Sequence, residues 1–155
     1  MCAVRLNESH PHNNGVLTYL SRPRPQAPAI AAPDAIENPY YRCGCHPDIV
    51  ERLWDRLGAA LPADCRCLVY SIPALVHPTS GIVLAIGMGT QYGLRLPAPL
   101  CTDAIAAGAL TITKWSGGEH TDIRQTLGDD WVFGAWLEGE LKWCREAYGM
   151  CDRAG

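Results

Sequence analysis

The chain has 155 residues, about the length of one domain, and 48% of them are hydrophobic, so it can bury a core without disulfides or metals. Its 13 basic residues against 16 acidic ones give a formal net charge of −3, which argues against nucleic-acid binding through a broad cationic surface. The longest apolar stretch, "GIVLAIGMG", is far shorter than the ~20 residues that cross a bilayer. Since no apolar signal-peptide core is visible near the N-terminus either, we expect a soluble, cytoplasmic protein with no membrane partner and mostly reduced cysteines.

A run of prolines marks the N-terminal quarter of the chain, in "SRPRPQAPAIAAPDAIENP". Prolines at this spacing are incompatible with a regular helix and remove backbone donors that a sheet would need. Extended, polyproline-like chain is the conformation that this composition favours. We therefore expect residues 1–38 to form an irregular arm, loosely attached to a single domain at residues 39–155.

The first helix is expected at residues 46–61, "HPDIVERLWDRLGAAL". Apolar side chains recur there every three or four residues, and a proline occupies the first turn, where it is tolerated. Two β-rich runs follow at residues 67–77 and 82–86, on either side of the turn sequence "PTSG". Because Pro73 lies inside the first run, we expect that strand to lie at the edge of a sheet or to contain a bulge.

Turn residues divide the rest of the chain into short periodic stretches. We expect a strand at residues 92–96, a short helix at 97–108, a strand at 109–115, a strand within 128–136 and a last helix at 135–149 that ends at its glycine. This order predicts an α+β domain in which an antiparallel sheet of about four to five strands has helices packed mainly on one face.

Several of these pieces occur together in a known arrangement: an apolar hairpin, then "YGLRLP", "AIAAGA", "DDWVFG" and "EGELKWCREAY". In this order, the stretch from Ala74 to Tyr148 resembles small uncharacterised bacterial α+β families of the MmcQ/YjbR kind. The resemblance covers about half of the chain and rests on residues that build a fold. It implies a compact α+β structure and carries no catalytic signature.

Two Cys-x-Cys pairs are the first candidates for chemistry, namely Cys43 with Cys45 and Cys65 with Cys67. Structural zinc sites use four tetrahedral ligands, usually offered as more widely spaced pairs. If residues 65 and 67 lie on a strand, their side chains share one side, which favours a joint site. Free cysteine also packs as a small hydrophobe, and we expect these four residues to be packing thiols and the protein to need no cofactor. A zinc site or a disulfide is the alternative.

The stretch "GMGTQYG" superficially matches a glycine-rich phosphate loop. Such loops follow a strand and precede a helix, whereas here a strand follows and no Walker lysine is present. We expect a bulge or a tight hairpin instead. If the stretch binds a ligand, Thr90, Gln91 and Arg95 supply its polar groups.

The loop "SGGEHTDIRQTLGDD", which lies between two tryptophans, is our first choice for an interaction surface. Partly exposed tryptophans are common interface anchors, and the surface would comprise Trp115, Glu119, His120, Asp122 and Trp131. The alternative is that both tryptophans belong to the core. The carboxylates of residues 117–130 could also hold a divalent ion, although such loops are more commonly turns with solvated charges.

No serine elbow and no clear pairing of a nucleophile with a base stands out in the sequence. We therefore favour a small non-enzymatic domain that binds a protein partner, for example a domain that neutralises or regulates a toxin. The alternative is a small metal-binding or hydrolytic enzyme that uses the Cys-x-Cys pairs or the acidic loop.

Overall fold

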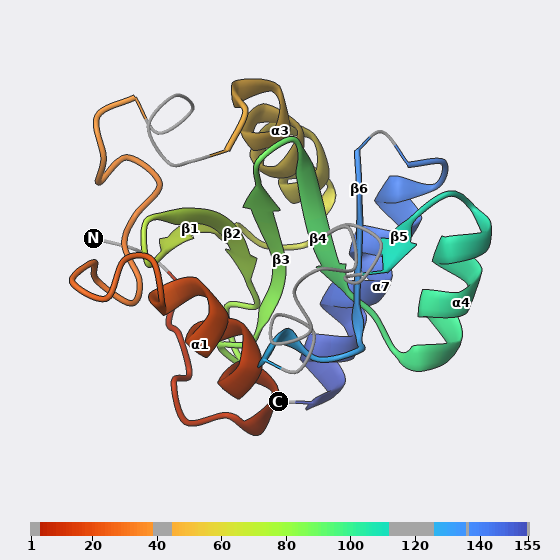
Figure 1. Ribbon diagram of the computed structural model, residues 1–155, viewed down its shortest axis with the longest axis horizontal. Coiled ribbons are helices and arrows are strands. Elements are labelled where there is room, and N and C mark those ends of the chain that lie inside the picture. The colour runs from red at the N-terminus through yellow and green to blue at the C-terminus, as the bar shows by residue number, and fades with distance from the viewer. Residues whose placement is uncertain (1–3, 39–44, 112–125, 136, 155) are drawn as a thin grey trace.

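The computed structural model describes residues 4–38, 45–111, 126–135 and 137–154 (Figure 1). Its centre is an antiparallel sheet whose six described strands follow the order β1-β2-β3-β4-β6-β5. The strands are Arg66–Val69 (β1), Ile72–Val76 (β2), Val83–Met88 (β3), Gln91–Arg95 (β4), Leu110–Thr111 (β5) and Trp131–Gly134 (β6). This architecture confirms the predicted α+β class, with one strand more than the upper end of the prediction.

Helices lie on both faces of the sheet, and most of them lie on one. They are η1 (Pro11–Asn13), α1 (Asn14–Ser21), α3 (Pro47–Glu51), the π-helical η2 (Arg52–Leu57), η3 (Gly58–Ala60), α4 (Ala98–Ala106) and α7 (Glu140–Ala154). The segment α3–η2 and helix α7 pack on one face, whereas α1 packs on the other (Figure 1). Within the described part of the chain, no helix is long and apolar enough to cross a membrane.

The extra strand arises because the expected strand at residues 67–77 is a hairpin. Tyr70 and Ser71 form its turn with φ angles of +48° and +65°, which non-glycine residues seldom adopt. Because neither residue is glycine or asparagine, the sequence carries no turn signal there. Pro73 therefore lies in the inner strand β2, and the edge position expected for it is wrong. The N–H and C=O groups of its partner Leu68 both form hydrogen bonds with Ala31. The missing N–H of Pro73 therefore costs no hydrogen bond between Leu68 and Pro73. A register shift does occur in β2, between Leu75 and Val76.

The predicted helix at residues 46–61 is confirmed as the continuous helical segment α3–η2–η3. Pro47 occupies its first turn, and the Nδ1 atom of His46 accepts a hydrogen bond from the backbone of Asp48. The apolar face packs on the sheet, with Leu53 and Trp54 at most 1% exposed. Burial of this stripe is the main source of stability for so short a helix.

The last helix is shifted relative to its prediction. It begins at Glu140, after Gly139 with a φ of +76°, and it continues through Gly149 to Ala154. Glycine in a helix costs only about 1 kcal/mol. Cys151, which is fully buried one heptad after Cys144, extends the packed face beyond the glycine and outweighs that cost.

The N-terminal segment is not the loose, irregular arm that we expected. Residues 14–21 form the helix α1, and its side chains of Val16, Leu17 and Leu20 are at most 8% exposed. Further along, Ala31 exchanges two backbone hydrogen bonds of 2.8 Å with Leu68 of β1. The prolines are concentrated after α1, so they do not interrupt this helix, and burial against the sheet stabilises an element that would be too short alone.

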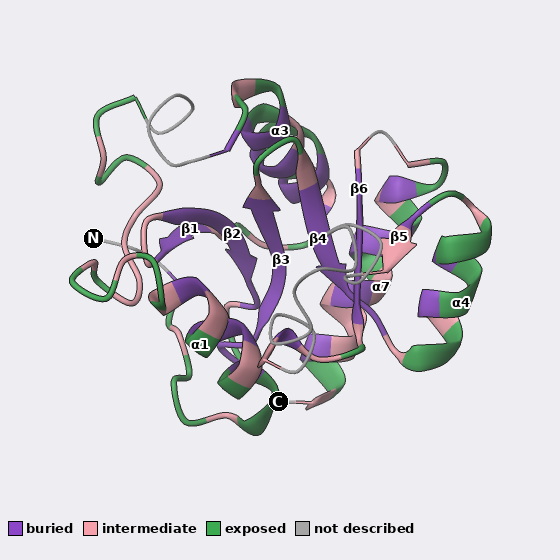
Figure 2. Ribbon diagram, viewed as in Figure 1, coloured by how far each residue is buried: buried purple, intermediate pink, exposed green. Residues whose placement is uncertain are grey.

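The sheet separates two hydrophobic cores, and all its strands except β5 are purple along most of their length in Figure 2 because both faces are covered. The first core joins the sheet to α3–η2, α4 and α7. The second core joins the opposite face to α1 and to Val4 and Leu127. Strand β2 is buried at all five positions, as expected for a strand with cover on both sides.

Candidate functional site

Most of the predicted interaction surface lies outside the described residues. Trp115, Glu119, His120 and Asp122 lie outside the described residues. Trp131 begins β6 and is only 2% exposed, in the second core. An interface anchor must reach solvent, so the structure contradicts an interface role for Trp131 and supports the alternative of core membership.

The glycine-rich stretch is the tight hairpin that we expected. Met88 pairs with Gln91, so Gly89 and Thr90 form a two-residue turn, and Gly89 has a φ of +56°. Gln91 and Arg95 lie four residues apart on one face of β4, a separation of about 13 Å at the rise of a β-strand. Thr90, Gln91 and Arg95 therefore do not converge on one ligand.

Arg95 instead links β4 to β6. Its Nε atom donates a 2.8 Å hydrogen bond to Oδ2 of Asp130, and its guanidinium carbon lies 5.8 Å from the centroid of the Trp131 ring. Arg95 Nη1 and Trp131 Nε1 are buried and have no hydrogen-bond acceptor among the described residues. Since Arg95 and Trp131 are only 6% and 2% exposed, these two side chains form a buried polar contact and not an open pocket. In the acidic loop, the Asp130 carboxylate is thus already engaged by a cation.

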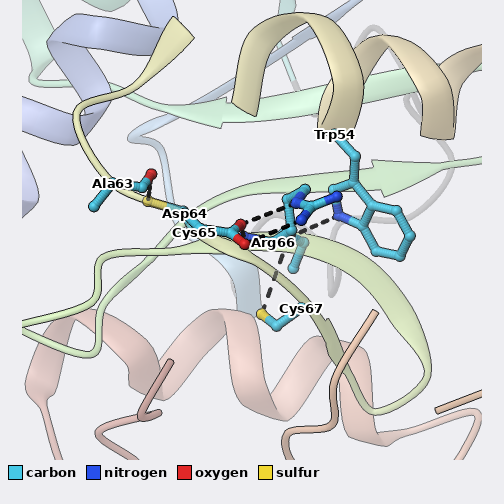
Figure 3. A network of polar contacts seen from close by, with 7 residues as sticks. Trp54, Ala63, Asp64, Cys65, Arg66 and Cys67 are labelled. Atoms are coloured by element: carbon cyan, nitrogen blue, oxygen red, sulfur yellow. Dashed lines mark hydrogen bonds and ion pairs between the residues drawn. The ribbon is translucent and has the colours of Figure 1, made fainter. Parts of the chain in front are cut away.

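The Cys-x-Cys residues do not share a site (Figure 3). Cys67 points into the second core, whereas Cys65 belongs to the first core and lies 3.4 Å from the carbonyl oxygen of Ala63. The expectation that both share one side of a strand is wrong, because β1 begins only at Arg66. Cys45 lies elsewhere, beside Gly87 of β3, and Cys43 falls outside the described residues. Among the described residues, no group of three or more His, Cys, Asp or Glu side chains could hold a metal.

Burial also lowers the reactivity of the thiols. Loss of solvation raises the pKa of Cys101 to about 11 and that of Cys65, Cys144 and Cys151 to about 12. Thiolate is the form that attacks electrophiles and binds metals. At neutral pH these four side chains are therefore protonated core residues.

The sequence analysis missed a buried ionic cluster in the first core. Glu140, which is 5% exposed, accepts hydrogen bonds from Arg52 Nε at 3.0 Å and from the Tyr92 hydroxyl at 2.7 Å. Burial and this hydrogen bond to a carboxylate raise the pKa of Tyr92 well above its usual range. Arg56 contributes a second cation, 3.4 Å from Oε1 of Glu140. The signal in the sequence is that Glu140 precedes Cys144 by four residues, on the buried face of the last helix.

A second missed feature is an open hollow of about 450 Å³ beside α1, which we call the α1 groove. It lies between the end of this helix, the proline-rich chain that follows and the sheet. Its lining consists of Tyr19, Leu20, Arg22, Pro23, Arg24, Ile72 and Met88. This groove was not predicted, because a loosely attached arm cannot form one wall of a groove.

Two further hollows are lined by described residues, and their character differs. One of about 440 Å³ includes Arg66, whose guanidinium holds the Asp64 carboxylate at 2.9 and 3.0 Å and lowers the pKa of Asp64. The other, of about 390 Å³, is lined entirely by charged side chains of both signs, Arg52 and Arg56 among them. Of these three hollows, the α1 groove is the one whose exposed surface is more apolar than polar.

Comparison with known proteins gives no relative: no family model, no curated protein and no solved structure matches the chain.

Proposed function

We propose that this chain is a small, soluble, non-enzymatic protein-binding domain that regulates or neutralises a partner protein, such as a toxin. The observation that carries the proposal is the α1 groove, an open and largely apolar hollow of about 450 Å³ on a domain whose other described apolar side chains are mostly buried. Interfaces commonly place an apolar or aromatic side chain of one partner into such a hollow of the other.

The state of the cysteines supports binding over thiol catalysis. A catalytic cysteine needs a lowered pKa and a nearby base. Burial shifts the pKa of Cys65, Cys144 and Cys151 in the opposite direction, to about 12. These thiols are therefore poor nucleophiles, which weakens the alternative of an enzyme based on them.

The geometry around His77 weakens the alternative of a serine hydrolase. Ser80, His77 and Asp152 resemble a catalytic triad in composition, and His77 Nε2 lies 3.1 Å from Oδ1 of Asp152. In a triad, one ring nitrogen is oriented by the carboxylate and the other faces the serine oxygen. Here Nδ1 accepts hydrogen bonds from the backbone N–H groups of Thr79 and Ser80, at 3.2 and 3.0 Å. The histidine therefore fixes a turn and cannot deprotonate the serine hydroxyl.

Site-specific photocrosslinking in the native cells tests the proposed function. A photoreactive phenylalanine analogue replaces Tyr19, a partly exposed aromatic residue of the groove. The matched control carries it at Ile105, which is 38% exposed on α4 and lies outside the groove. We expect a discrete protein adduct from position 19 and none from position 105.

The same experiment with Met88→Glu in the groove decides whether the adduct is specific. A buried charge in the apolar wall opposes docking, so the adduct at position 19 should disappear while the circular dichroism spectrum and the melting temperature stay close to those of the parent protein. Equal adducts from positions 19 and 105, or no adduct from either, would contradict a protein-binding role for this surface.

A further inference from the structure

We infer that the α1 groove recognises an acidic, apolar segment of its partner: a large apolar side chain enters the hollow, and a neighbouring carboxylate pairs with the arginines at its rim. This inference rests on the proposed binding function and adds the chemistry of the ligand. It follows from the apolar wall, from the sign of the charges beside it and from the rigidity of the chain that carries them.

The apolar wall of the groove, with Leu20 from α1 and Ile72 and Met88 from the sheet, favours an apolar side chain of the partner. Leu20 and Ile72 are 1% and 4% exposed, and Met88 at the end of β3 is half-buried beside them. Methionine adapts its shape to different apolar partners. A hollow of this size offers room for a large leucine or phenylalanine side chain, and its burial provides the main gain in free energy on binding.

The positive charges at the rim of the groove favour a carboxylate in the ligand. The charged residues that line the groove are Arg22 and Arg24, although the chain as a whole has a net charge of −3. A guanidinium group matches a carboxylate with two parallel hydrogen bonds and is only weakly hydrated, so it is well suited to an interface. A basic segment would meet repulsion at the same place, and this difference in sign is the source of specificity.

The helix that forms one wall is held in place at its start by a buried side chain. Asn13, which is fully buried, donates from Nδ2 to the carbonyl oxygens of Asn7 and Gly81 at 2.7 and 2.8 Å. Its Oδ1 accepts from the backbone N–H of Val83 in β3 at 2.9 Å. These three hydrogen bonds fix α1 against the sheet before any ligand arrives.

The proline-rich chain that carries the arginines is held as well. Arg24 donates its backbone N–H to Ser21 at 3.2 Å, and Ala27 donates to Arg24 at 3.1 Å, so two successive turns follow the helix. A few residues later, Ala31 is paired to β1. Prolines further restrict the backbone between these points. The groove is thus preorganised, and binding costs little conformational entropy.

Direct binding of synthetic peptides tests the ligand chemistry. The probe is a fluorescent peptide with Leu-Phe between pairs of glutamates, measured by anisotropy against the full-length protein. The control peptides replace either the glutamates by lysines or Leu-Phe by Ala-Ala. We expect the acidic Leu-Phe peptide to bind at least about tenfold more tightly than both controls.

Charge reversal in the protein makes the test specific. Arg24→Glu should weaken the acidic peptide about tenfold or more and should improve binding of the lysine peptide. Arg5→Glu changes the net charge equally at an exposed position outside the groove, and it should leave both affinities nearly unchanged. Equal effects of the two variants, or equal binding of the acidic and lysine peptides, would overturn the inference.

Three more outcomes relate this inference to the proposed function. If position 19 crosslinks a partner in cells but the acidic peptide does not bind, the protein-binding function stands and the inferred chemistry is wrong. If decanoate binds with the same dependence on Arg24 and the acidic peptide does not, the groove is a site for a small amphipathic carboxylate and the inference fails. If neither peptide nor crosslink is observed, both proposals fail.

Discussion

The two faces of the sheet are built in different ways. The first face is covered by α3–η2 and α7, whose apolar stripes repeat along the sequence, and it contains the buried cluster of Glu140, Arg52 and Tyr92. The second face is covered by a helix of eight residues and by irregular chain, and the Asn13 side chain holds the start of that helix by hydrogen bonds to backbone groups. A regular apolar pattern is therefore only one of the ways in which a chain can cover a sheet. The irregular cover is also the one that leaves a groove open.

The largest effect should come from removing the charge at the centre of the first face. Glu140→Ala removes the carboxylate that pairs with Arg52, whose side chain is 18% exposed, and that accepts the hydrogen bond from the Tyr92 hydroxyl. Breaking a buried ion pair from one side costs about 3–5 kcal/mol. Urea unfolding measures it, with Asp64→Ala in the exposed pair with Arg66 as the control, for which we expect less than about 1 kcal/mol. Similar losses in both variants would mean that the cluster adds nothing to the first face.

The next effect tests whether the second face is a real core. Leu20→Ala in α1 removes a side chain that is 1% exposed, and such truncations cost about 2–5 kcal/mol when the cavity persists. Thr18→Ala, on the exposed side of the same helix, is the matched control and should change the free energy of unfolding by less than about 0.5 kcal/mol. If both variants unfold at the urea concentration of the parent protein, α1 is not part of the cooperative unit.

A smaller loss is expected where the second face depends on hydrogen bonds and not on apolar area. Asn13→Ala leaves the buried carbonyl of Gly81 and the N–H of Val83 without this partner. An unsatisfied buried polar group costs about 1–3 kcal/mol. Hydrogen exchange should then show faster exchange in α1 than in α7. Equal protection of both helices in the variant would show that the asparagine does not anchor α1.

The smallest effect for a single residue, over one pH unit, concerns each thiol of the first face. The pKa of Cys65, Cys144 and Cys151 is raised by burial from 9.0 to about 12 in the folded protein. Above pH 9 the unfolded chain loses these protons first, so this contribution to stability is complete below pH 9 and is lost as the pH rises toward 12. Each thiol adds about 1 kcal/mol of loss per pH unit in that window.

Urea unfolding at pH 8 and pH 10 under reducing conditions measures this loss, and Cys144→Ala isolates the part due to one thiol. The variant should show the shallower dependence on pH. An unchanged slope would mean that Cys144 ionises in the folded protein as readily as in the unfolded chain.

Elements whose signals lie within a few neighbouring residues could be predicted from the sequence, and elements set by distant contacts could not. The helix at residues 46–61 and the hairpin at Gly89 were predicted, because periodicity and a glycine turn are written in neighbouring residues. The turn at Tyr70 and Ser71 was not, because non-glycine residues carry its positive φ angles. The shared side expected for Cys65 and Cys67 failed because the strand begins between them.

The candidate site was harder to predict than the fold. The roles considered for Thr90, Gln91 and Arg95 assumed that nearness in sequence means convergence in space, and a strand separates such residues instead. The α1 groove joins Tyr19 and Arg24 to Ile72 and Met88, four residues from three distant parts of the chain. These parts are far apart in the sequence, so no local sequence motif could predict the groove.

The order of residues along the chain is enough to specify the α+β class, most of the helices and strands and the apolar stripe that faces the first core. These features depend on the order of polar and apolar residues over one or two turns, where the backbone geometry is nearly fixed. Folding in three dimensions places α1 on the second face, buries Glu140 against Arg52 and Tyr92 and leaves a groove beside two arginines. Those features arise from contacts between residues far apart in the chain, and their free energy exists only once the sheet has formed.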